Sequence, residues 1–115
     1  MNLSYAEAMS LSDAIVAGLS EGDCEVVLAP SYLYLHEVLR RVGHCDRMAI
    51  AAQNCASFDR GAYTGEVSTS MLASVGIEYV IIGHSERQKI FHESDSEIAT
   101  KVRIALLSEI GRAHV

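Results

Sequence analysis

The sequence predicts a parallel α/β fold, because short apolar strands alternate with helical stretches along the whole chain. In the helical stretches, apolar residues recur every three or four positions. The runs between them are short, rich in β-branched residues and apolar at successive positions, which is typical of strands in a parallel sheet. The order helix, strand, helix, strand, helix, strand, helix favours right-handed crossover connections.

The first helix is expected to begin after Ser4, a suitable N-cap, and to run to about Leu19. Its apolar face consists of Ala8, Leu11, Ile15 and Leu19. Gly22 and Asp23 interrupt the pattern, and a strand at residues 24–29 follows. Because this strand is apolar at successive positions, we expect it to be buried on both faces.

The next cycle consists of a second helix, a second strand and a long polar loop. The helical stripe comprises Leu35, Val38, Leu39 and Val42. Gly43 stands where a C-terminal cap is expected. The strand is expected at residues 48–52 and the loop at residues 53–66, with turns at Gly61 and Gly65.

The last part of the chain completes the alternation. A short helix is expected at residues 69–75, stopped by Gly76, and a third strand at residues 79–82. Ser94 and Glu97 then form a capping-box pattern ahead of the final helix. The apolar stripe of that helix comprises Ile98, Val102 and Ala105.

These three strands and four helices fit two architectures equally well, an open doubly wound sheet and a closed (β/α)₈ barrel. A (β/α)₈ barrel needs roughly 250 residues. The 115 residues would therefore supply about half of one. The chain also opens with a helix rather than a strand, so we expect both ends of such a barrel to be missing.

Composition excludes several classes of partner. The net charge is −6 and the basic residues are scattered, whereas nucleic-acid binding needs clustered Lys and Arg. No apolar run approaches the length that crosses a bilayer, and the N-terminus lacks the features of a signal peptide, so we expect a cytoplasmic protein without membrane contact. Cys24, Cys45 and Cys55 lack C-x-x-C spacing, which predicts small hydrophobic side chains rather than a metal site or disulfides.

Chemically active residues are concentrated directly after the third strand, at Gly83, His84, Ser85, Glu86 and Arg87. Ligands of parallel α/β proteins bind beyond the carboxyl ends of the strands, so His84 should face the site. Gly83 permits backbone angles that a side chain would block. A helical turn after His84 would direct its N–H groups at the imidazole and hold the ring neutral. Such a ring can polarise a carbonyl and stabilise an enediolate, while Glu86 orients a nearby cation and Arg87 braces the loop.

The spacing alone is equally compatible with an ordinary hydrogen-bonded loop residue at His84 and a solvated surface at Glu86 and Arg87. The other histidines have no comparable setting; they are His36, His44, His92 and His114. We expect His36 and His44 at the surface.

Residues 80–87 (VIIGHSER) closely resemble the strand and loop that carry the electrophilic histidine of the triosephosphate isomerase family. Four further segments resemble that family in its own order, namely residues 28–30 (LAP), 51–55 (AAQNC), 61–68 (GAYTGEVS) and 91–95 (FHESD). His92 stands where the family usually has glycine. The resemblance extends over nearly the whole chain.

This resemblance implies a (β/α)₈ TIM barrel that interconverts dihydroxyacetone phosphate and glyceraldehyde 3-phosphate in glycolysis and gluconeogenesis, through an enediolate and without a metal or organic cofactor. In triosephosphate isomerases, a glutamate base acts together with a neutral histidine electrophile. By resemblance, His84 is that electrophile, and Glu86 matches a glutamate that interacts with the active-site lysine. The loop at residues 53–66 resembles one that reaches into the neighbouring subunit, which implies a homodimer. The residues of this loop that we assign to the interface are Gln53, Asn54, Thr64, Gly65 and Glu66.

Some parts of the family pattern have no counterpart. Met1 and Asn2 match only the last two letters of its first strand, N-W-K-M-N, so the substrate-binding lysine is missing. The carboxylate base, the mobile loop and the glycine-rich phosphate site belong to the family's second half. We therefore expect the 115 residues alone to be inactive and, with two unpaired sheet edges, to associate or aggregate. A folding or association module, and another phosphosugar enzyme on the same barrel, remain alternatives.

The two ends are expected to be artificial. Met1 is read as an internal methionine, and residues 1–109 as a partial barrel domain. Residues 110–115 (IGRAHV) are read as a non-native tail, because the codons ATC-GGA-AGA-GCA-CAC-GTC would encode them and resemble a common sequencing adaptor. A helix end capped by Gly111 is the alternative.

Overall fold

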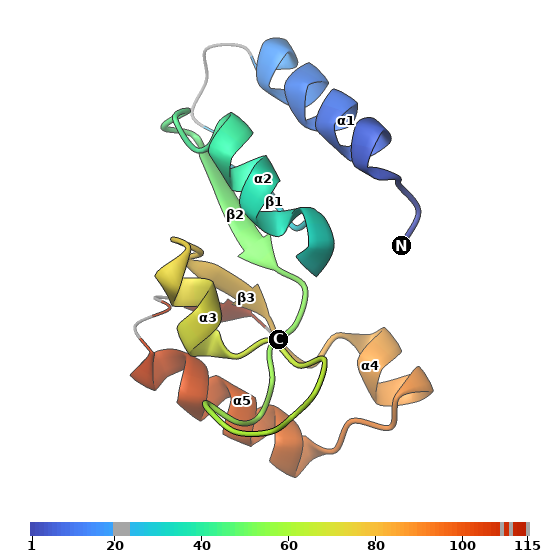
Figure 1. Cartoon of the computed structure of the whole chain (residues 1–115), viewed down its shortest axis with the longest axis vertical. Coiled ribbons are helices and arrows are strands. Elements are labelled where there is room, and N and C mark those ends of the chain that lie inside the picture. Colours follow the sequence, from blue (N-terminus) through green and yellow to red (C-terminus); the bar gives the residue numbers. More distant parts are fainter. Residues whose placement is uncertain (20–23, 109, 111, 115) are drawn as a thin grey trace.

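The strands form a single parallel sheet in the order β1-β2-β3-β4, so that each strand lies beside the one that follows it in the chain (Figure 1). They are β1 (Val26–Leu28), β2 (Met48–Ala52), β3 (Tyr79–Ile81) and β4 (Arg112–His114). The computed structural model describes residues 1–19, 24–108, 110 and 112–114. Residues 112–114 are described by their backbone alone. A doubly wound sheet reverses its strand order, whereas a barrel keeps it sequential, so the structure favours the barrel.

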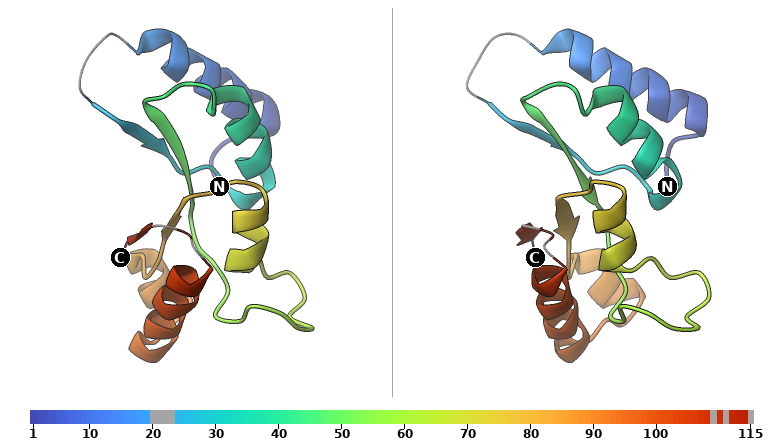
Figure 2. Two further views of the ribbon diagram at one scale, coloured as in Figure 1. Left: turned by 90° about the vertical axis from the view of Figure 1, so that its left-hand side faces the viewer. Right: turned by 60° about the vertical axis from the view of Figure 1, so that its left-hand side comes forward.

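One helix precedes β1, and the others fill the connections between the strands. They are α1 (Tyr5–Gly18), α2 (Tyr32–Val42), α3 (Thr69–Ser74), α4 (Ser85–Ile90) and α5 (Asp95–Leu107). Figure 2 shows α2 and α3 along the same side of the strands, with α1 on the outer side of α2. The described residues thus form part of a (β/α)₈ barrel, with strands inside and helices outside.

Two elements go beyond the predicted three strands and four helices. The first is α4, for which the sequence predicts only a helical turn. The second is β4, which pairs in parallel with β3. Ile110, just before β4, is buried in the core at 1% exposure. That residues 110–115 are non-native stays a prediction, and residues 111 and 115 lie outside the described part of the chain.

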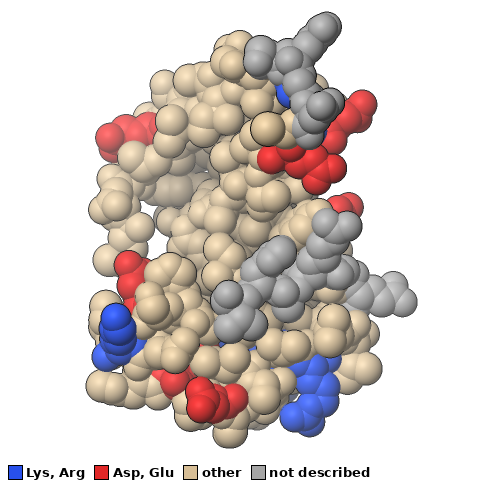
Figure 3. Space-filling model, turned by 180° about the vertical axis from the view of Figure 1, so that it is seen from behind, with Lys and Arg blue, Asp and Glu red and all other residues tan. Residues whose placement is uncertain are grey.

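Helices cover only one face of the sheet near β1. Val26 and Leu28 pack against the core, whereas Val27 between them points to the opposite face and is 47% exposed. The prediction that this strand is buried on both faces is therefore wrong, because within the described residues no second layer covers the face that carries Val27. In the view from behind, charged residues lie towards the margins and the described surface between them is uncharged (Figure 3).

The first helix begins as predicted and buries a slightly different face. Ser4 is its N-cap and forms a complete capping box with Glu7. Ala8 and Ser12 are buried, but Leu11 is 50% exposed, which corrects its predicted place in the apolar stripe. The helix packs mainly on α2, so a narrow face is enough to bury it. The predicted break at Gly22 and Asp23 lies outside the described residues.

The remaining helix boundaries follow from local chemistry. Gly43 is the C-cap of α2, and its N–H donates to the carbonyl of Leu39. Gly76 follows α3 with φ of 90°, a left-handed conformation that favours glycine. The hydroxyl of Ser94 caps α5 by accepting from the N–H of Glu97. The core between sheet and helices includes Val38, Val42, Ile50, Ala52, Leu72, Val80, Ile82 and Ala105.

Candidate active site

The candidate site begins where β3 ends. Ile82 is fully buried, and Gly83 follows it with φ of 76°, in the left-handed region. The side-chain amide of Gln88 donates to the Gly83 carbonyl at 2.7 Å, which fixes the turn. Glycine is needed here because an L side chain in this conformation costs roughly 1–2 kcal/mol. The predicted special backbone at Gly83 is confirmed.

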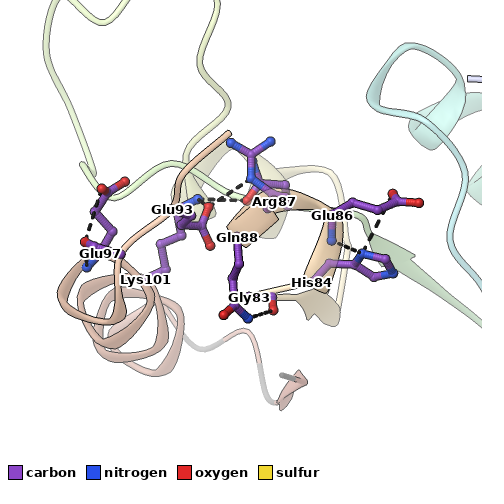
Figure 4. Close-up of polar contacts among 10 residues, drawn as sticks. Gly83, His84, Glu86, Arg87, Gln88, Glu93, Glu97 and Lys101 are labelled. Atoms are coloured by element: carbon purple, nitrogen blue, oxygen red, sulfur yellow. Dashed lines mark hydrogen bonds and ion pairs between the residues drawn. The ribbon is translucent and has the colours of Figure 1, made fainter. Parts of the chain in front are cut away.

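His84 is the N-cap of α4, directly beyond the carboxyl end of β3. Its Nδ1 accepts a hydrogen bond from the backbone N–H of Glu86 at 3.1 Å (Figure 4). An Nδ1 that accepts carries no proton, so in a neutral ring the proton lies on Nε2. The side chain is 49% exposed, which leaves it accessible to a ligand. The predicted contact between a helical N–H and the imidazole is confirmed, while the catalytic role of His84 stays a prediction.

Glu86 and Ser85 lie at the open side of this turn. The Glu86 side chain is 76% exposed, and its Oε2 lies 3.7 Å from His84 Nδ1. At that distance the contact is an ion pair only when His84 is protonated, whereas the backbone bond to Nδ1 fits the neutral ring. Ser85 is the exposed first residue of α4.

A buried ion-pair network is formed by residues that follow His84 in the chain. Oε2 of Glu93 accepts from Arg87 Nε at 2.9 Å and from Lys101 Nζ at 2.7 Å (Figure 4). The Glu93 and Lys101 side chains are only 2% and 5% exposed. Arg87 also stacks its guanidinium over Phe91, at 4.8 Å from the ring centre. Both contacts tie Arg87 to the segment after α4, while its role in bracing the loop stays a prediction.

The network continues to the loop after β2. Lys101 Nζ also donates to Asn54 Oδ1 at 2.9 Å. Burial by itself would raise the pKa of Glu93, but the hydrogen bonds and positive charges of Lys101 and Arg87 outweigh it and hold that pKa below its ordinary value. The structure thus brings together two predicted site residues, Asn54 and Arg87, through two residues for which the sequence predicts no role.

One feature of the sequence could have indicated that Lys101 is buried. It lies three residues after Ile98 and four before Ala105, so it interrupts the apolar stripe of α5. A lysine on such a face is buried only when it is paired. Sequence spacing gives no means of naming its partners, because Asn54 lies 47 residues away.

The other residues of the predicted interface loop lie further out. Gln53 ties the end of β2 to β1, since its side-chain amide donates to the Ala29 carbonyl at 2.7 Å. The loop closes at its base, where the N–H of Ala56 donates to the Val67 carbonyl at 2.8 Å. Its outer part exposes Thr64, Gly65 and Glu66.

Internal contacts hold the outer part of this loop. The rings of Phe58 and Tyr63 stack at a centroid distance of 3.9 Å, and the Ser70 hydroxyl of α3 hydrogen-bonds Asp59. A hollow of about 450 Å³ lies between the loop and α3. His84 is not among the residues that line it, so this hollow is separate from the candidate site.

The described residues contain no cluster of three or more His, Cys, Asp or Glu that could hold a metal ion. Within the same residues, no helix has the length and apolar character needed to span a membrane. The cysteines are free thiols in three environments: Cys55 is buried, Cys45 is half-buried and Cys24 is exposed. The prediction of small hydrophobic side chains thus fits Cys55 and is wrong for Cys24, which precedes the edge strand β1.

Comparison with known proteins gives a consistent result. A family model described as triosephosphate isomerase matches residues 1–111. A triosephosphate isomerase of Chlorobium luteolum is 46% identical over 110 residues, which cover 94% of this chain and 44% of that relative. Relatives with the same name from Treponema denticola and Porphyromonas gingivalis are 42% and 39% identical. Those two matches each cover 92% of this chain, and 42% and 43% of the relatives. The chain therefore spans less than half the length of the curated relatives that it matches.

Proposed function

Because the chain belongs to the triosephosphate isomerase family, we propose that the complete protein interconverts dihydroxyacetone phosphate and glyceraldehyde 3-phosphate. The reaction proceeds through an enediolate, without a metal or organic cofactor, and serves glycolysis and gluconeogenesis in the cytoplasm. The observation that carries the proposal is the hydrogen bond from the Glu86 N–H to His84 Nδ1. It leaves the Nε2–H of a neutral imidazole for the substrate.

The role of His84 follows from this tautomer. Its Nε2–H donates a hydrogen bond to the carbonyl oxygen of the substrate and stabilises the negative charge that develops there as the neighbouring carbon loses its proton. Such a preorganised donor contributes a factor of about 10²–10³ in rate. The carboxylate that takes the proton has no counterpart in the 115 residues, so we expect no turnover from this chain alone.

We also propose that the complete protein is a homodimer in which the loop at residues 53–66 reaches the partner subunit. Two observations support this role. The outer residues Thr64, Gly65 and Glu66 are exposed, and the loop is ordered by its own aromatic stack and base hydrogen bond. A loop ordered in advance loses less conformational entropy when it binds.

The test uses the coding sequence extended beyond both ends of the 115 residues. The expressed protein should convert dihydroxyacetone phosphate in a coupled assay and should behave as a dimer in sedimentation. His84→Gln should lower kcat about 10²–10³-fold, whereas His36→Gln, on the exposed side of α2, should leave it unchanged. An inactive complete protein, a fully active His84→Gln variant, or robust turnover by the 115 residues alone would contradict the proposal.

A further inference from the structure

The Glu93 carboxylate connects two neighbouring helices and, through Lys101, a loop that is distant in the sequence. Arg87 lies on α4, whose N-cap is His84, Lys101 lies on α5, and Asn54 lies near the start of the loop after β2. Both hydrogen bonds converge on a single oxygen, since Oε2 accepts from Arg87 and from Lys101. Oε1 is equally buried and receives no hydrogen bond from any described residue.

We propose that Glu93 is a positioning residue for His84, which it holds through Arg87, and that Lys101 extends the same restraint to Asn54. This inference rests on the proposed role of His84. It assigns Glu93 and Lys101 a task beyond stability, because they couple the histidine turn to the base of the loop that we assign to the subunit interface.

The geometry supports positioning in preference to substrate contact. Glu93 and Lys101 are 2% and 5% exposed, so neither reaches a ligand directly. Arg87 is one turn into α4, and its backbone N–H donates to the His84 carbonyl at 2.9 Å. A displacement of Arg87 therefore moves the turn that directs the Glu86 N–H at the imidazole. Hydrogen bonds between charged groups in a buried site are among the strongest restraints a protein can apply.

The network also explains why Asn54 belongs to the same unit. Its Oδ1 is held by the ammonium that Glu93 holds. Cys55, the next residue, is fully buried, so any loosening of Asn54 should expose that thiol. The chain therefore contains one reporter at each end of the network, the amide of Glu86 and the thiol of Cys55.

The test measures both reporters in the complete protein, expressed from the extended coding sequence. Glu93→Gln removes the charge and keeps the shape and one carbonyl oxygen for Arg87 or Lys101. We expect amide exchange of Glu86 and disulfide-reagent modification of Cys55 to accelerate roughly tenfold, the effect of weakening one charged hydrogen bond. The ¹⁵N chemical shift of His84 Nδ1 should move towards the value of a ring nitrogen that accepts no hydrogen bond. Amides within β2 and β3 should keep their exchange rates.

Glu97→Gln is the matched control. It removes the same charge four residues further along, in the first turn of α5, but Glu97 is exposed, and its carboxylate accepts from the hydroxyl of the nearby Ser94. We expect this variant to leave Glu86, Cys55 and the His84 Nδ1 shift unchanged. Equal changes in both variants would overturn the inference, because they would assign the effect to net charge.

Two other results would overturn the inference. One is an unchanged Glu86 amide in Glu93→Gln, and the other is uniform acceleration of all amides, which indicates global destabilisation. If Glu93→Gln does not fold, Asn54→Ala serves as the test, because it removes the hydrogen bond between Lys101 and Asn54 and leaves Glu93 in place. Faster exchange of the Glu86 amide in this variant would support the coupling between Asn54 and the His84 turn. An unchanged exchange rate would exclude it. None of these measurements uses substrate, so an inactive complete enzyme would refute the proposed function and leave this result standing.

Discussion

The two loops that follow β2 and β3 are stabilised in different ways. The β3 loop, at residues 83–94, is short and is tied to the interior by the buried Glu93 carboxylate. The β2 loop, at residues 53–66, is longer and is held by contacts near the surface, such as the stack of Phe58 on Tyr63. Both rings of that stack are partly exposed, at 46% and 44%.

The difference matches the roles that we propose. A histidine that stabilises developing charge must stay fixed, and buried charged hydrogen bonds provide that rigidity. A loop that meets another subunit needs an exposed outer part and an ordered shape. The two loops are linked through Lys101 of α5, whose Nζ donates both to Glu93 of the β3 loop and to Asn54 of the β2 loop. The following predictions test how far the stability of each loop depends on its own anchor.

The largest effect is expected from Lys101→Ala. Among the described residues it leaves the buried Glu93 paired with Arg87 alone, and breaking a buried ion pair costs about 3–5 kcal/mol. The free energy of unfolding in urea should fall by that amount. The exposed Lys89 of α4 offers a control, since Lys89→Ala should change the unfolding free energy little. Similar losses in the two variants would show that the buried network adds no stability.

A smaller effect is expected at alkaline pH, at the base of the β2 loop. Burial raises the pKa of Cys55 from 9.0 to about 11, with a further contribution from Glu93 that Lys101 opposes. As the pH rises, the thiol therefore loses its proton in the unfolded chain before it does so in the folded chain. The contribution of Cys55 to the free energy of unfolding is thus complete below pH 9 and is lost as the pH rises to about 11. The expected loss is about 2–3 kcal/mol.

Urea unfolding across this pH range measures the loss. Burial also raises the pKa of Tyr32, so the wild type must be compared with Cys55→Ala, in which the thiol contribution is absent. Parallel pH profiles for the two chains would contradict the assignment to Cys55.

The smallest expected effect is an increase in stability. His92 has φ of 56°, and no other non-glycine residue in the described chain has a positive φ. His92→Gly removes this strain and should stabilise the β3 loop by about 0.5–1 kcal/mol, after the greater entropy of glycine in the unfolded state is included. The same substitution at His36, within α2, should destabilise by a similar amount. A loss of stability in both variants would show that the conformation of His92 carries no strain.

Much of this site could be predicted from local sequence. The helix boundaries at Ser4, Gly43 and Ser94 depend on neighbouring groups, and the structure places each cap as predicted. The position of His84 after a buried strand and the left-handed Gly83 follow from the same local rules. The partners of Lys101 could not be predicted, because they lie 8 and 47 residues away.

The sequence by itself determined the alternation of helices and strands, the place of His84 and the resemblance to a family, since each depends on a contiguous run of residues. Tertiary structure decided which faces are covered. It left Val27 exposed and Leu11 outside the buried face of α1, although both are apolar. It also joined Asn54, Glu93 and Lys101 into one network. The physical reason is the same in each case: burial and ion pairing depend on neighbours that folding brings together from distant parts of the chain.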